Sequence, residues 1–165
     1  MDTNGSLYVQ AKFQLTEYLE KHHMRKTPER FEVLGAVCQM DDIFSIEQLS
    51  EKMRKDSSFQ VSRVTLFNTL EMFVDAQLVI KHTLQRASLY EKNIDKRPRV
   101  CMVCHQCGLV RRLEKVEVTR FLNEIKTRQF FVRQPVLYLH GLCRKCEMAR
   151  RKEIRMREKK LTTKK

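Results

Sequence analysis

The sequence predicts an α+β fold in two parts, and three observations support this prediction. Between residues 7 and 75, apolar side chains recur at the three- and four-residue spacing of helices. Residues 78–93 change to β-branched and apolar residues around a short polar turn, as in a β-hairpin. Two Cys-x2-Cys pairs follow among strand-like segments, separated by 35 residues. We therefore expect a helical domain ending in a hairpin, followed by a small α/β domain.

Four helices are expected before the hairpin. The first, at residues 7–22, spaces Val9, Phe13, Leu15 and Leu19 in a helical pattern. In the second, Pro28 suits the first helical turn. The expected N-caps of the second to fourth helices are Thr27, Ser45 with Gln48 at the capping-box position, and Ser62.

Three short helices followed by a hairpin form the pattern of a winged helix-turn-helix. In that arrangement the third of the three helices, here about residues 62–75, is the one placed to enter the major groove of DNA. Many small α+β domains share such a pattern, so this motif alone is only moderately specific.

The remaining chain is expected to form the smaller domain. Residues 93–99 are polar and include Pro98, which indicates a hinge. The expected elements are strands at 100–104 and 108–113, a helix at 115–127, a last strand within 130–143 and a helical tail.

The two Cys-x2-Cys pairs predict one structural zinc ion per chain. Each turn can wrap half of a tetrahedral Zn²⁺ with thiolates, and Gly108 permits the tight backbone of such a turn. Four sulfur ligands leave no open position, so the ion is expected to stabilise the fold and not to catalyse. A reducing compartment favours ligation over disulfides, and two unrelated thiol pairs are the alternative. The expected ligands are Cys104, Cys107, Cys143 and Cys146.

Two cysteines and two histidines stand outside this ligand set. Cys101 lies three residues before Cys104, and an odd offset along a strand places the two side chains on opposite faces. Cys101 is therefore either a buried inert thiol or a sensor of redox state or metal. Cys38 is expected in the core, and His105 and His140 are expected at the surface.

The net charge of +13 is unevenly distributed. Residues 1–100 hold 15 Lys/Arg against 14 Asp/Glu, whereas residues 101–146 and residues 147–165 each hold 9 against 3. This surplus favours a polyanionic partner, and nucleic acid is the commonest one in the cytosol. A solubilising surface without a specific partner is the alternative.

Membrane proteins and enzymes are not expected. No run approaches the ~18 apolar residues that a membrane helix needs. The N-terminus has neither the basic nor the apolar region of an export signal, so a cytoplasmic location is expected. Neither an open metal site, a phosphate-binding loop nor a catalytic triad is visible.

Four motifs in order resemble the ferric uptake regulator family of bacterial repressors, over about residues 10–147. "RKTPER" is similar to the opening of the family's second helix, "VSRVTLFNTLEMFVDAQLV" to its recognition helix, and "CHQCGLV" and "HGLCRKC" to its zinc knuckles. The resemblance implies a homodimer that binds a pseudo-palindromic operator in double-stranded DNA. The implied parts are a winged-helix domain at 1–92, a hinge at 93–99, a zinc-containing dimerisation domain at 100–147 and a basic tail at 148–165.

The family's regulatory metal site is altered in this sequence. The resemblance implies a His-rich run before the first knuckle, but residues 97–101 read Arg-Pro-Arg-Val-Cys. Ile43, Thr119 and Pro135 stand at other sensory positions, and only Glu91 remains, with no imidazole partner. A lone carboxylate does not select a transition metal, and arginines repel cations. We therefore predict a transcription regulator that is not controlled by the usual metal.

The recognition helix implied by the resemblance also differs from the family pattern, with Phe-Asn in place of Tyr-Arg. Phe67 can contact a thymine methyl group, and Asn68 suits adenine where Arg prefers guanine; Asn68 facing solvent or capping is the alternative. Gln77 stands where Gly usually ends this helix, which leaves the turn geometry open. Phosphate contacts are expected from Arg25, Lys26 and Arg30, and groove contacts from Arg63, Thr65, Phe67 and Asn68.

A second hypothesis belongs to a different class of protein. The chain could be a zinc-ribbon interaction module that binds RNA or a protein through its basic C-terminal half, beside a vestigial winged helix. The near-zero charge of residues 1–100 favours it, because a DNA-reading domain is usually more basic.

Overall fold

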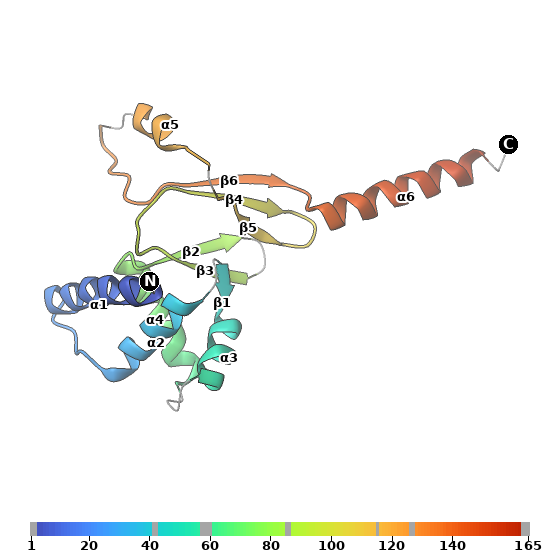
Figure 1. The fold of residues 1–165 in the computed structure, drawn as a ribbon. Coiled ribbons are helices and arrows are strands. Elements are labelled where there is room, and N and C mark those ends of the chain that lie inside the picture. The colour runs from blue at the N-terminus through green and yellow to red at the C-terminus, as the bar shows by residue number, and fades with distance from the viewer. Residues whose placement is uncertain are drawn as a thin grey trace. The chain divides into compact units, whose positions relative to one another are not determined.

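The computed structural model describes residues 3–40, 43–56, 61–84, 87–114, 116–125 and 128–162. The chain divides into two compact units, Met1–Arg97 and Pro98–Lys165, whose elements Figure 1 shows. The mixed α+β fold confirms the predicted class. In the described ranges, none of the helices is long and apolar enough to cross a membrane.

The first unit contains four helices and a small antiparallel sheet. The helices are α1 (Thr3–Lys21), α2 (Pro28–Gln39), α3 (Ile46–Asp56) and α4 (Arg63–Asp75). The strands are β1 (Ile43–Ser45), β2 (Val79–Leu84) and β3 (Ala87–Lys92), paired in the order β1-β3-β2. The helices and the hairpin strands occur where the sequence predicts them, while the hairpin's turn residues lie outside the described part. Strand β1 was not predicted, and it joins the sheet by pairing Phe44 with Tyr90 of β3.

Local capping signals explain where the helices begin. The Ser45 amide donates to Gln48 Oε1 at 2.8 Å and the Gln48 amide donates to Ser45 Oγ at 3.3 Å, which is the predicted capping box. Ser62 Oγ accepts from the Thr65 amide at 3.1 Å and caps α4. Thr27 has the backbone conformation of an N-cap, but its side chain makes no capping hydrogen bond.

Helix α4 ends without the glycine that usually occupies the residue after a helix. Gln77 has φ of 58°, in the left-handed region that glycine favours. Its amide donates to the Val74 carbonyl at 2.9 Å, and the Leu78 amide donates to the Phe73 carbonyl at 2.9 Å. These two bonds form a Schellman motif, with buried Leu78 and Phe73 in the same core.

One apolar core stabilises the first unit. It is built from all four helices and the sheet and includes Leu34, Leu49, Leu70, Phe73 and Tyr90. Helix α1 contributes Ala11, Leu15 and Leu19, which are spaced four residues apart and fully buried. Val9 and Phe13, which contribute to the helical pattern in the sequence, lie outside this face and are 68% and 65% exposed.

The second unit is a three-stranded sheet with two helices. Its elements are β4 (Arg99–Cys104), β5 (Val110–Arg112), α5 (Thr119–Glu124), β6 (Val136–Gly141) and α6 (Arg144–Thr162). Strand β4 lies in the middle, antiparallel to β5 and parallel to β6.

Three elements of this unit are shorter than predicted. Of the helix expected at 115–127, residues 115, 126 and 127 lie outside the described residues, and within the described part the helix is α5. No residue of α5 is buried, so its apolar positions lack the packing that would extend it. Strand β5 begins late because the knuckle turn runs to Gly108, which has φ of 74°. Strand β6 occupies only the second half of the expected segment.

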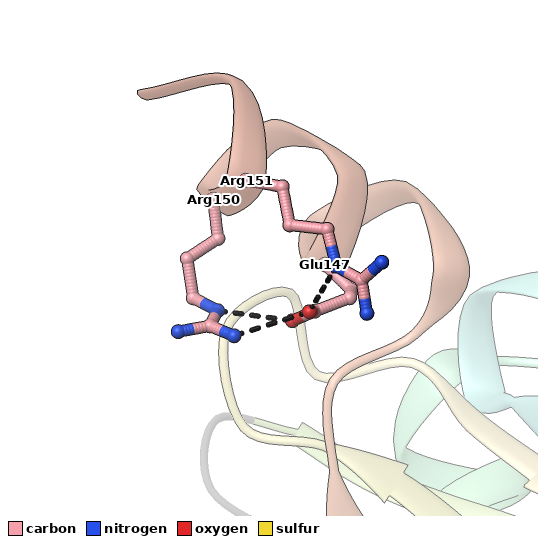
Figure 2. A network of polar contacts seen from close by, with 3 residues as sticks. All are labelled: Glu147, Arg150 and Arg151. Carbon is pink, nitrogen blue, oxygen red and sulfur yellow. Dashed lines mark hydrogen bonds and ion pairs between the residues drawn. The ribbon is translucent and has the colours of Figure 1, made fainter. Parts of the chain in front are cut away.

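The tail helix α6 is held by ion pairs within the helix. Figure 2 shows Glu147 between two arginines: Arg150 Nε lies 2.9 Å from one carboxylate oxygen and Arg151 Nε lies 2.7 Å from the other. Hydrogen bonds from Arg150 and Arg151 lower the pKa of Glu147 to about 2. Residues 148–160 are all exposed, so such contacts and helix propensity replace core packing.

Candidate functional site

The sheet of the second unit brings the two cysteine pairs together. Strands β4 and β6 are parallel neighbours, with Cys104 in register with Gly141, so both knuckles follow the same edge. The His105 amide donates to the Gly141 carbonyl at 3.0 Å and ties the first knuckle to the end of β6. Cys143 lies just beyond β6, and Cys146 lies in the first turn of α6.

The four thiols have the spacing that a tetrahedral metal site needs. The sulfurs of Cys104, Cys107, Cys143 and Cys146 all lie within 4.8 Å of one another, and Cys107 Sγ lies 3.8 Å from Cys143 Sγ. Zn–S bonds of about 2.3 Å at tetrahedral angles place sulfur atoms about 3.8 Å apart. The residues therefore fit a structural zinc ion, which would replace the thiol protons and join both knuckles to the start of α6.

The electrostatics of the knuckles favour thiolate at part of this set. Backbone N–H groups of Cys143 and Cys107 lower the pKa of Cys104 to about 6. The Cys146 thiol donates to Cys143, which raises the pKa of Cys146 to about 12, with burial acting in the same direction. A divalent cation would favour deprotonation of all four thiols.

The other two cysteines are separate from this set. Cys101 is fully buried in β4, where it is in register with Arg112 and Tyr138, and its sulfur is not part of the four-thiol cluster. Cys38 is buried in the core of the first unit, and this burial raises its pKa to about 11. Cys38 is thus the core residue that its helical position predicted.

Helix α4 buries one face and exposes the other. Leu66, Leu70 and Phe73 face the core, whereas Arg63, Val64, Thr65, Phe67 and Asn68 are exposed in the first two turns. The set expected in a DNA groove is therefore accessible on one short surface. Val64, 70% exposed, was missed by the sequence reasoning because nothing local distinguishes it from a core valine.

Three of the predicted residues line one groove of the first unit. This groove, of about 750 Å³, lies between the start of α2 and the exposed side of α4, and includes Arg30, Thr65 and Asn68. Glu29 also lines it, so the groove is of mixed charge, and Met24, Val61 and Met72 give it an apolar part.

Several of the residues predicted to contact DNA already have partners within the chain. Arg63 Nη2 lies 2.6 Å from Glu47 Oε1, and Lys26 forms an ion pair with Glu20. Arg30 donates to the backbone carbonyl of Arg25. These are exposed contacts, and they are weak enough for a phosphate to replace the carboxylate.

Phe67 has a neighbour that the sequence did not indicate. Lys81 Nζ of β2 lies 5.5 Å from the centre of the Phe67 ring and 2.7 Å from Glu71 Oε1. This cation–π contact orients the ring on the exposed side of α4 and adds a cation next to it. The packing of α4 against β2, and not closeness in sequence, creates this neighbourhood.

The expectation that Glu91 has no imidazole partner is wrong. His82 Nε2 of β2 lies 3.1 Å from Glu91 Oε2 of β3, and both side chains are buried. The hairpin register makes them diagonal neighbours, since His82 pairs with Leu89, two residues from Glu91. The first unit therefore holds two donors of metal-binding type, although the predicted His-rich run is absent.

The fold and the four-cysteine cluster define a two-unit α+β protein whose cysteines fit a structural zinc ion. The family model of the ferric uptake regulator family matches residues 21–140, and the chain belongs to that family. The members of this family are transcription regulators. Among curated proteins, none matches the chain.

Solved structures of regulators share this fold. The ferric uptake regulator of Pseudomonas aeruginosa with manganese has a TM-score of 0.64 at 20% identity, covering 78% of this chain and 97% of that one. The ferric uptake regulator of Helicobacter pylori has a TM-score of 0.63 at 16% identity, with coverages of 89% and 95%. A zinc uptake regulator complexed with zinc and DNA has a TM-score of 0.52 at 24% identity, with coverages of 91% and 99%.

Proposed function

We propose that this protein is a sequence-specific, DNA-binding transcription regulator that represses its targets. The observation that carries the proposal is the exposed face of α4, where Arg63, Thr65, Phe67 and Asn68 occupy the first two turns. In helix-turn-helix proteins the N-terminal residues of the recognition helix contact base edges. The solved zinc uptake regulator with DNA supports the same reading, since its fold is similar.

In this proposal residues 1–92 are a winged-helix domain with β2 and β3 as the wing. Arg25, Lys26 and Arg30 hold phosphates at the start of α2, while α4 lies in the major groove. Residues 93–99 act as the hinge, because β3 ends at Lys92 and β4 begins only at Arg99.

The proposed zinc ion is structural, one per subunit. The ligands are Cys104, Cys107, Cys143 and Cys146, and they leave no coordination position for a substrate. Zinc supplies stabilisation at the knuckles, where few apolar side chains are buried. The thiolates fix α6 to the ends of β4 and β6.

We propose a homodimer formed through residues 100–147. This segment exposes apolar side chains that a single chain leaves in water, including Met102, Leu139 and Phe131, the last 87% exposed. Met102 and Leu139 also line an apolar groove of about 580 Å³ beside the knuckles. A second copy covering such a surface is consistent with two α4 helices reading two half-sites.

The proposed DNA affinity does not depend on Fe²⁺ or Mn²⁺. Residues 97–101 supply no histidine, and Ile43, Thr119 and Pro135 supply no donor side chain. The buried His82–Glu91 pair is the feature that could oppose this proposal, because it retains an imidazole and a carboxylate. Zinc must therefore be included among the metals tested.

The test is selection from random duplex DNA by the full-length, zinc-loaded protein, followed by affinity measurements on the selected duplex. We expect a two-fold symmetric motif bound by a dimer. Fe²⁺, Mn²⁺ or added Zn²⁺ should leave the affinity unchanged. A tenfold tightening with any of these metals would show that a regulatory metal site persists.

The zinc-ribbon hypothesis remains the second candidate because of one observation. The unit Met1–Arg97 holds 14 Lys/Arg against 14 Asp/Glu, whereas Pro98–Lys165 holds 19 against 6. If selection returns no duplex motif while RNA or a protein binds the second unit, that hypothesis replaces the first.

A further inference from the structure

Helix α6 is a strongly charged surface that the proposed function does not use. The family model ends at residue 140, before α6 begins at Arg144. From Met148 to Lys160 every residue is exposed. Only the first turn is fixed, through Cys146 in the four-thiol cluster.

The charges of α6 are segregated around the helix. At 100° per residue, six of its nine Lys/Arg fall within one arc of about 120°, and all three of its Glu fall outside that arc. We call these six residues the basic stripe: Arg144, Lys145, Arg151, Lys152, Arg155 and Lys159.

Ion pairs on the other side sharpen this segregation. Glu147 binds Arg150 as well as Arg151, and Glu153 lies 2.6 Å from Arg157. Arg150 and Arg157 lie opposite the basic stripe, so Glu153 and part of the charge of Glu147 are compensated by cations outside the stripe, while Arg151 of the stripe shares Glu147.

The basic stripe also has shape and length suited to an extended anion. Arg144, Arg151, Lys152 and Arg155 line a shallow groove of about 690 Å³ together with Glu147, Met148 and Ala149. From Arg144 to Lys159 the helix rises about 22 Å at 1.5 Å per residue. That length is about two thirds of one turn of duplex DNA, which repeats every ~34 Å.

We propose that the basic stripe of α6 binds the phosphate backbone of duplex DNA, as a second contact beside the α4 face. This inference rests on the proposed function, since a chain already bound through α4 presents α6 to the same DNA at high effective concentration. The contact reads charge and carries no base preference, because long Lys and Arg side chains on one exposed helix face match phosphates.

Two other polyanionic partners fit the helix less well. Residues 144–162 contain no aromatic side chain, so α6 has nothing on which the bases of single-stranded RNA could stack. A membrane-surface helix needs a broad apolar face, but the part of α6 outside the stripe carries Glu147, Glu153 and Glu158.

The experiment compares two triple variants of the full-length, zinc-loaded protein that have the same net charge. The stripe variant is Lys152→Gln/Arg155→Gln/Lys159→Gln. The control variant, Arg150→Gln/Arg157→Gln/Lys160→Gln, changes the opposite side. Gln is a good helix former, and circular dichroism and zinc content confirm that both variants fold.

The readout is the affinity for a 40-base-pair duplex without the selected motif, measured between 50 and 200 mM salt. The slope of log K against log salt is negative, and each lost phosphate contact makes it shallower by about 0.9. If three contacts are lost, the fall in affinity between 50 and 200 mM salt therefore becomes about 40-fold smaller. We expect the stripe variant to show this shallower slope. The slope of the control variant should change by less than a third as much.

Equal slopes for the two triple variants would overturn the proposal, since net charge alone would then explain them. Parallel titrations use a 40-nucleotide single-stranded RNA and vesicles with one third anionic lipid. The proposal would also be overturned if the wild-type protein bound the RNA or the vesicles more tightly than the duplex and the stripe variant lost that binding. Failure of the proposed function is separate, because it shows as the absence of a selected motif in wild type.

Discussion

The two units of this chain are stabilised by different means. The first unit buries a continuous core, from Ala11 in α1 to Ile94 after β3. In the second unit the buried apolar residues of the described chain are confined to β4 and the knuckles, and α5 buries none. We therefore expect the second unit to depend on the proposed zinc ion where the first depends on the hydrophobic effect.

The units also differ in charge, and this difference divides their proposed roles. The first is neutral in sum and exposes a short mixed surface on α4, which suits discrimination between bases. The second carries the whole surplus of +13, which suits attraction to phosphate without discrimination. Sequence reading and electrostatic attraction are thus assigned to separate parts of one chain.

The largest expected effect is the loss of the second unit on removal of a zinc ligand. Cys104→Ser or Cys146→Ser should abolish zinc binding, and structural zinc contributes about 10–16 kcal/mol in small domains. Metal analysis should give one zinc per wild-type chain and none per variant chain. Hydrogen exchange should show lost protection in β4, β5 and β6 and unchanged protection in the first unit.

The control for this prediction is Cys101→Ser. Cys101 is not in the four-thiol cluster, so the variant should keep one zinc per chain. A fall in zinc content would mean that Cys101 supports the site, against the face predicted for it.

The next effect tests the core of the first unit. Phe73 is fully buried, so Phe73→Ala should destabilise this unit by about 3–5 kcal/mol through lost burial and a cavity. Phe13→Ala, at a position 65% exposed, should change the unfolding free energy by less than about 0.5 kcal/mol. Denaturant unfolding followed by hydrogen exchange measures both. Zinc release by Phe73→Ala would show that the units are not independent.

Local signals explain how much of this architecture the sequence could predict. The Ser45–Gln48 box and the Ser62 cap act over three residues, so they are readable without tertiary structure. The cysteine spacing is equally specific, because a metal site requires few residues in a fixed pattern. These features appear in the structure as expected.

Contacts that depend on strand register could not be predicted in the same way. His82 meets Glu91 only because the hairpin pairs His82 with Leu89. Strand β1 exists because Phe44 and Tyr90 pack across the sheet, their ring centres 6.2 Å apart. Helical periodicity also misled at Val9, since an apolar residue on a helix is not always directed to a core.

A smaller effect tests the division between base reading and charge. Asn68→Arg should shift the preference at one position per half-site from A·T toward G·C, and Asn68→Ala should relax it, at about 1–3 kcal/mol of discrimination. Because residue 68 contacts no phosphate in this proposal, Asn68→Ala and wild type should have the same slope of log K against log salt. Selection from random DNA measures the preference. Identical motifs for all three proteins would move the reading role to Arg63 and Thr65.

The smallest effect concerns the strained end of α4, inside the well-packed unit. Gln77 occupies the left-handed position of the Schellman motif, which costs an L-residue about 1–2 kcal/mol, while glycine would add about 0.5–1 kcal/mol of freedom to the unfolded chain. Gln77→Gly should therefore stabilise the first unit by up to about 1 kcal/mol in urea unfolding. Gln77→Ala keeps a Cβ at φ of 58° and should bring no gain. Equal stabilities of the Gly and Ala variants would mean that the strain of a Cβ at this position is no larger than the freedom that glycine adds to the unfolded chain, because both variants keep the two backbone hydrogen bonds of the turn.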